Sequence, residues 1–137
     1  MLPSSLTSLP FVLHILVEVP AAFTFALFPS TTLLRPQPDA HAVIRQYGLL
    51  LLSTNIIASL FVFENRGSNS IDDPIWHIEA WVAGSLALYH VGPLMRAGSR
   101  SWRGGGKGRS FVGQPRAHVI AHGICLIALA GRSLHWW

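Results

Sequence analysis

The sequence predicts an all-α fold, an integral membrane four-helix bundle, and two observations support this. Half of the 137 residues are hydrophobic and only 12% are charged, whereas soluble domains carry about 25% charged residues. Four stretches are each about 20 mostly apolar residues long, which is the length that a helix needs to cross a bilayer. The chain is short enough for one domain, so we expect residues 1–137 to form a single four-span membrane domain.

Each apolar stretch is predicted to be a helix, because lipid offers no hydrogen-bond partner to the backbone of an open strand. The first stretch could instead be a cleaved signal peptide. However, no Lys or Arg precedes it, and it contains His14 and Glu18, which signal peptides rarely tolerate. We therefore expect it to be a permanent span. The four expected spans are about 9–28, 42–63, 75–95 and 117–137.

The segments between the spans have the composition of loops. Residues 29–40 contain three prolines, and residues 64–74 are polar and end at Pro74, so helix is disfavoured in both. Residues 96–116 are rich in glycine, serine and arginine, which is typical of a flexible segment.

The distribution of charge predicts the orientation. Residues 96–116 hold six of the ten basic residues and no acidic one, so the positive-inside rule places this loop in the cytosol. With four spans, both termini then lie on the non-cytosolic side. Tryptophans gather at the expected non-cytosolic ends of the spans, as interfacial belts do: Trp76, Trp81, Trp136 and Trp137. We expect a protein of the endoplasmic reticulum.

Several classes of function are not expected. A single cysteine excludes a disulfide framework and a cysteine-based metal site. The chain has no Walker loop, GxSxG or GxGxxG motif, so ATP-driven transport and serine hydrolysis are disfavoured. The basic segment 96–116 is short and glycine-rich, and topology and anionic lipid account for its charge. We therefore expect the lipid bilayer as a partner, no nucleic acid and no cofactor.

Ionisable side chains inside the spans are the main candidates for a functional site, because burying them in a membrane is costly. At 100° per residue, His14 and Glu18 share one helix face, and so do Glu79 and His90. Asn55 belongs to the polar stripe of the second span. The alternative is structural: His14 and Glu18 could form an ion pair, and Asn55 could hold two helices together.

These residues suggest an acid–base enzyme that needs no cofactor and acts on a lipophilic small molecule. A carboxyl group in a low-dielectric setting favours its protonated form, so it can donate a proton to an alkene or epoxide and later accept one. The reaction would be an isomerisation or a cyclisation. The expected catalytic residues are Glu18 as the acid, His14 as the base or orienting group, and Glu79; the expected substrate-binding residues are Asn55, Tyr89 and His90.

A histidine-ligated metal or haem is a further alternative. His118 and His122 have the i, i+4 spacing of a helical metal-binding pair, and His90 comes out at a similar depth to His122. Val119 stands where an HExxH motif has its glutamate. Our main expectation is no metal, with these three histidines as candidate ligands. We also expect His90 and His122 to face each other.

Two segments carry a resemblance to a known group of proteins. Residues 41–47 (HAVIRQY) and 87–93 (ALYHVGP) resemble segments of small four-span membrane proteins predicted in filamentous fungi. The resemblance implies a eukaryotic endomembrane protein. Some small fungal membrane proteins serve secondary-metabolite biosynthesis, among them membrane terpene cyclases that use intramembrane carboxylic acids. The remaining alternative is a non-catalytic carrier, or a partner of a larger membrane enzyme.

Overall fold

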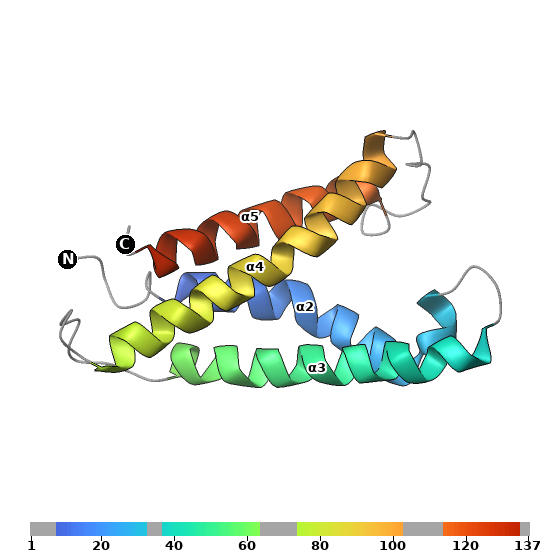
Figure 1. Ribbon diagram of the computed structural model, residues 1–137, viewed down its shortest axis with the longest axis horizontal. Helices are drawn as coiled ribbons and strands as arrows, with labels where there is room; N and C mark the ends of the chain where they lie inside the picture. The colour runs from blue at the N-terminus through green and yellow to red at the C-terminus, as the bar shows by residue number, and fades with distance from the viewer. Residues whose placement is uncertain (1–7, 33–36, 64–73, 103–113, 135–137) are drawn as a thin grey trace. The chain divides into compact units, whose positions relative to one another are not determined.

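The computed structural model describes residues 8–32, 37–63, 74–102 and 114–134, and within these ranges every regular element is a helix. Four of these elements are long α-helices, drawn as coiled ribbons in Figure 1. The all-α fold class is therefore confirmed. The elements are α2 (Leu9–Leu27), the short 3₁₀ helix η1 (Pro29–Thr32), α3 (Pro38–Phe63), α4 (Pro74–Trp102) and α5 (Pro115–Ser133).

Among the described residues, prolines begin three α-helices and lie inside two. Pro38, Pro74 and Pro115 are the first residues of α3, α4 and α5. The prediction of a loop over 29–40 is accordingly wrong at both ends, where η1 and the start of α3 are helical. The physical reason is that proline lacks only an N–H that the first helical turn leaves unpaired, and its fixed φ suits a helix.

Helix α4 continues beyond the predicted span. It runs through Pro93 and ends at Trp102, so residues 96–102 are helical and the prediction of a flexible segment is wrong there. Alanine and arginine are good helix formers, and the single Gly98 costs only about 1 kcal/mol. Residues 103–113 lie outside the described residues, as do Trp136 and Trp137.

The chain divides into two compact units. One contains α3, η1 and α2 from Phe11 onward, and the other contains α4 and α5. The prediction of one domain over residues 1–137 stays a prediction.

In the first unit, α2 and α3 come into backbone contact at Gly48. A Cβ atom at Gly48 would lie 2.6 Å from the backbone nitrogen of Ala26 and 2.9 Å from the backbone oxygen of Ala22. Nearer the other end of the pair, the rings of Phe11 and Phe61 stack with centroids 5.1 Å apart. Glycine at the crossing allows an approach that any larger side chain would prevent, as in tightly packed membrane helices.

In the second unit, α4 and α5 run side by side (Figure 1). Small residues line the contact on α4: Ala83 and Ala87 are buried, and a Cβ at Gly84 would lie 2.7 Å from Oγ of Ser133 on α5. These small residues therefore allow α4 to pack closely against α5.

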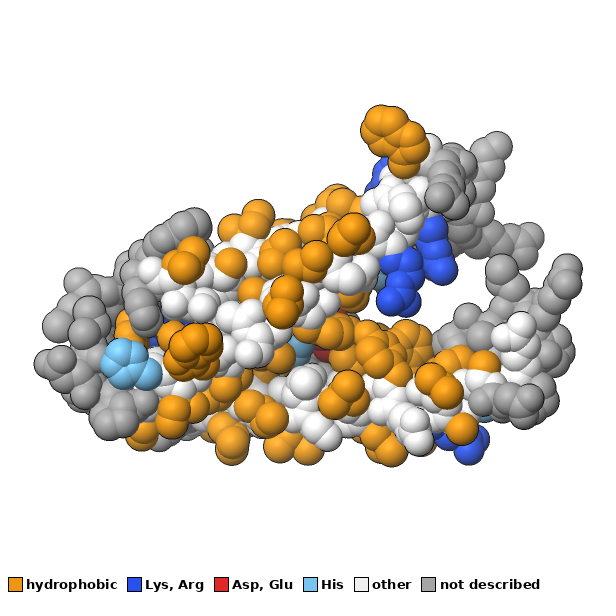
Figure 2. All heavy atoms as spheres, viewed as in Figure 1, with side chains coloured by type: hydrophobic (Ala, Val, Ile, Leu, Met, Phe, Trp, Pro, Cys, Tyr) orange, Lys and Arg blue, Asp and Glu red, His pale blue; other side chains and the backbone are white. Residues whose placement is uncertain are grey.

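Many large hydrophobic side chains of the described helices are exposed, and Figure 2 shows hydrophobic side chains spread over the visible face. By length and composition, α2 and the Ala40–Phe63 part of α3 qualify as membrane spans. The other two described helices, α4 and α5, do not meet that criterion. Two of the four expected spans are thus supported.

Candidate functional site

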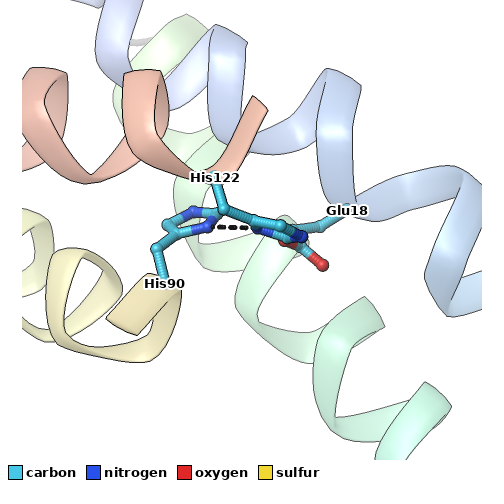
Figure 3. Close-up of side chains that lie close together, drawn as sticks. All are labelled: Glu18, His90 and His122. Atoms are coloured by element: carbon cyan, nitrogen blue, oxygen red, sulfur yellow. Dashed lines mark hydrogen bonds between the residues drawn. The ribbon is translucent and has the colours of Figure 1, made fainter. Parts of the chain in front are cut away.

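The central feature of the second unit is a pair of buried histidines. His90 on α4 and His122 on α5 place their Nδ1 atoms 2.9 Å apart, and both side chains are buried. The dashed line in Figure 3 marks this hydrogen bond. One imidazole donates its N–H and the other accepts, so at least one ring is neutral. The prediction that these two histidines face each other is confirmed.

Two further rings lie beside the pair. Tyr89 meets His90 edge-on, with ring centroids 5.2 Å apart. His118 lies one turn before His122 on α5, and their rings are nearly parallel with centroids 6.1 Å apart. His118 is exposed, so the three imidazoles form a row that leads from the surface of the unit to a buried position.

A second buried polar contact joins α4 to α5. The Nε and Nη2 atoms of Arg132 both donate to Oε1 of Glu79, each at 2.9 Å, and the guanidinium lies 3.9 Å from the ring centroid of Trp76. Both charged side chains are buried. Glu79 therefore has a counter-ion, which favours a role in holding the two helices together.

Sequence reasoning missed this contact. It assigned no role to Arg132, whose exposed fraction is 3% in the structure. A usable signal was present. Glu79 lies near the start of the third predicted span and Arg132 near the end of the fourth, so antiparallel spans place the opposite charges at the same depth.

In the first unit, the expected acid and base are both fully buried. His14 and Glu18 have exposed fractions of 0% and 1% and lie one turn apart on α2. They occupy the middle of a buried stripe that begins at Phe11 and ends at Ala22. The stripe follows the i, i+3 and i+4 spacing of one helix face, as the sequence predicted.

Asn55 on α3 is the other buried polar residue of this unit. Its Nδ2 donates to the backbone oxygen of Leu51 at 2.7 Å, while its Oδ1 is buried and has no hydrogen-bond partner among the described residues. Leaving a buried acceptor unpaired costs about 1–3 kcal/mol. A hydroxyl or N–H of a bound molecule would satisfy this oxygen.

The predicted site residues therefore divide between the units. His14, Glu18 and Asn55 belong to the first unit, and Glu79, Tyr89 and His90 to the second. Within the second unit, Tyr89 and His90 lie with His122 and His118, but Glu79 lies eleven residues before His90 on α4. At 1.5 Å per residue this is roughly 16 Å along the helix axis. Glu79 and His90 therefore lie on the same helix face but not in the same site.

Comparisons with protein-family models, with curated proteins and with solved structures give no match to this chain. The residues and their geometry are therefore the basis of the function proposed below.

Proposed function

We propose that this protein is a membrane enzyme that carries out cofactor-independent acid–base chemistry, an isomerisation or a cyclisation, on a lipophilic small molecule. The observation that carries the proposal is the burial of Glu18, 1% exposed, within the apolar helix α2. A carboxyl group removed from water favours its protonated form. It is then able to protonate an alkene or an epoxide that would not react with water alone.

The proton can be followed through one cycle. The Glu18 carboxyl transfers its proton to an alkene carbon or epoxide oxygen of the substrate, which becomes a cation. The cation loses a proton from a neighbouring carbon to His14, and a new C=C bond forms. The proton returns from His14 to Glu18, so the enzyme ends as it began. The unpaired Oδ1 of Asn55 would orient a substrate hydroxyl.

The other predicted site residues have different support. The ion pair with Arg132 favours a structural role for Glu79 over the catalytic one. The substrate-binding roles of Tyr89 and His90 stay predictions.

The membrane setting is part of the proposal. Helices α2 and α3 carry exposed apolar side chains such as Leu16, Ile56 and Leu60, which suit contact with lipid. We propose that α4 and α5 also span the bilayer, because the pairing of Glu79 with Arg132 lowers the cost of placing both charges there. Both termini would lie on the non-cytosolic side of the endoplasmic reticulum, with the basic segment in the cytosol.

The fungal resemblance supports a substrate from secondary metabolism. The second candidate function, a non-catalytic partner of a larger membrane enzyme, draws support from the same exposed apolar side chains. Those side chains would suit a helix of another protein as well as lipid.

Deuterium exchange tests the enzyme proposal without knowledge of the product. The full chain, purified in nanodiscs, is incubated in D₂O with isoprenoid alkenes and epoxides, and substrate mass is followed. We expect enzyme-dependent incorporation of deuterium that Glu18→Gln abolishes and Thr24→Val, an exposed change on the same helix, leaves intact. Full incorporation by a normally expressed Glu18→Gln variant would contradict the proposal. Absence of exchange together with stable co-purification of a membrane enzyme would favour the partner function.

A further inference from the structure

We propose that His90 and His122 bind a divalent first-row transition metal ion between α4 and α5, with His118 as a third ligand. The inference concerns the α4–α5 unit alone. It goes beyond the acid–base function proposed above and does not depend on it.

The geometry of the two buried rings carries the inference. Their Nδ1 atoms lie 2.9 Å apart and both point at the space between them (Figure 3). Imidazole binds Zn²⁺ at 2.0–2.1 Å. Two nitrogens at that distance from one ion are about 2.9 Å apart at a right angle and about 3.4 Å apart at the tetrahedral angle. With ring centroids 5.2 Å apart, the two nitrogens lie on the line between the rings. Each ring must therefore turn by roughly 35–45° to direct its Nδ1 at one ion in place of the shared proton.

His118 is placed to complete the set. The centroid of an imidazole lies roughly 3.2 Å from an ion that it binds, so two rings on one ion are at most roughly 6.4 Å apart. At the tetrahedral angle two such rings are roughly 5.2 Å apart. The His90–His122 centroid separation is 5.2 Å, whereas the His118–His122 separation of 6.1 Å is larger, so His118 must move closer to bind the same ion. The exposed ring of His118 can turn from its stacked position toward the pair, and it gives an ion a route from water.

The donor set indicates the class of ion. Imidazole nitrogens suit Zn²⁺, Cu²⁺, Ni²⁺ and Co²⁺, whereas Ca²⁺ and Mg²⁺ prefer oxygen. Three histidines leave a fourth position open to water, which is the arrangement of catalytic rather than structural zinc sites. Three neutral ligands do not offset the charge of the ion, so we expect weaker binding than at thiolate sites.

A packing role alone would not require this pair. Burying two imidazoles removes their polar ring nitrogens from water, which carries a desolvation cost. Two apolar side chains of similar size would fill the same space without that cost. A bound metal ion adds two strong bonds at the point where both rings converge.

Cobalt serves as the probe, because Co²⁺ takes zinc sites and absorbs visible light. The full chain, purified with a tag free of histidine and stripped with chelator, is titrated with Co²⁺ in detergent. We expect one ion per chain, a visible absorption band, and displacement by Zn²⁺. His90→Gln and His122→Gln should each weaken binding at least about tenfold, and His118→Gln should weaken it less.

The matched control is His77→Gln, which removes an exposed histidine from the same helix as His90. It should leave the stoichiometry and the absorption band unchanged. Circular dichroism establishes that each variant keeps its helices. Equal Co²⁺ affinity in the wild type and the folded His90→Gln and His122→Gln variants would overturn the proposal, as would absence of binding by the wild type. The pair would then be a hydrogen bond only.

Discussion

Arg132 directs both its Nε and its Nη2 at one carboxylate oxygen of Glu79, at 2.9 Å each, while its guanidinium covers the ring of Trp76. One buried arginine thus fixes the register of α5 against α4 by charge and by ring contact at the same time.

Removing one member of this ion pair should be costly. Arg132→Leu leaves the carboxylate of Glu79 buried without its counter-ion, and we expect a loss of about 3–5 kcal/mol in the free energy of unfolding. Arg116→Leu, at an exposed position on the same helix, should change it by at most about 0.5 kcal/mol. Denaturation in detergent measures both. The double variant Glu79→Leu with Arg132→Leu should recover much of the loss, and failure to do so would show that the pairing is not its cause.

Glycine at position 48 should resist substitution. In Gly48→Ala the new Cβ would overlap the backbone of α2 at Ala26, so the helices must separate, at a cost of about 1–3 kcal/mol. At Gly92 on α4, by contrast, an added Cβ would point into open space, with no neighbouring atom of the described residues within 4 Å. Gly92→Ala should therefore stabilise the protein by up to about 1 kcal/mol through helix propensity. Thermal unfolding of the two variants would contradict this packing if both shifted the same way.

Two substitutions of Glu18 together distinguish a catalytic role from a structural one. Glu18→Gln keeps the size and hydrogen-bonding capacity of the side chain but has no titratable proton, so turnover should fall at least about a hundredfold with little change in stability. Glu18→Leu should abolish turnover as well. Activity and unfolding are measured on the same preparations. If the Glu18→Gln variant is active and only Glu18→Leu lowers the stability, Glu18 holds helices together and is not the acid.

Because Oδ1 of Asn55 is unpaired among the described residues, we expect replacement of Asn55 to weaken substrate binding. Asn55→Leu removes a buried acceptor that lacks a partner among the described residues, so stability should be unchanged or slightly higher. If the oxygen orients a substrate hydroxyl, the same variant should raise KM about tenfold or more, with a smaller effect on kcat. An unchanged KM would remove Asn55 from the binding site.

The orientation is open to a direct experiment. A glycosylation acceptor inserted into residues 64–73 should be modified in microsomes, because that segment would face the lumen. The same acceptor inserted into residues 103–113 should not be, because the basic segment would be cytosolic. The reversed pattern would reject the orientation, and modification at both positions would reject four spans.

Much of the fold could be predicted because apolar length is a local property of the sequence. The contact between His90 and His122 could also be predicted, because the helical period and the depth in the membrane together determine which side chains meet. The ends of the helices were harder to predict from the sequence. Pro38 and Pro93 are compatible with a loop and with a helix, and tertiary packing decides between them. Predicting that Arg132 pairs with Glu79 requires knowing how two distant segments pack. The sequence pattern of a single span does not contain that information.

The pairing of Glu79 with Arg132 also has a consequence for biogenesis. The two residues are 53 positions apart in the chain, so at about 5–20 residues per second the ribosome completes Glu79 roughly 3–10 s before Arg132. During that interval the carboxylate has no counter-ion, and lipid would be an unfavourable place for α4. In a four-span topology the translocon must therefore retain α4 until α5 has been synthesised, and release the two as a neutral hairpin.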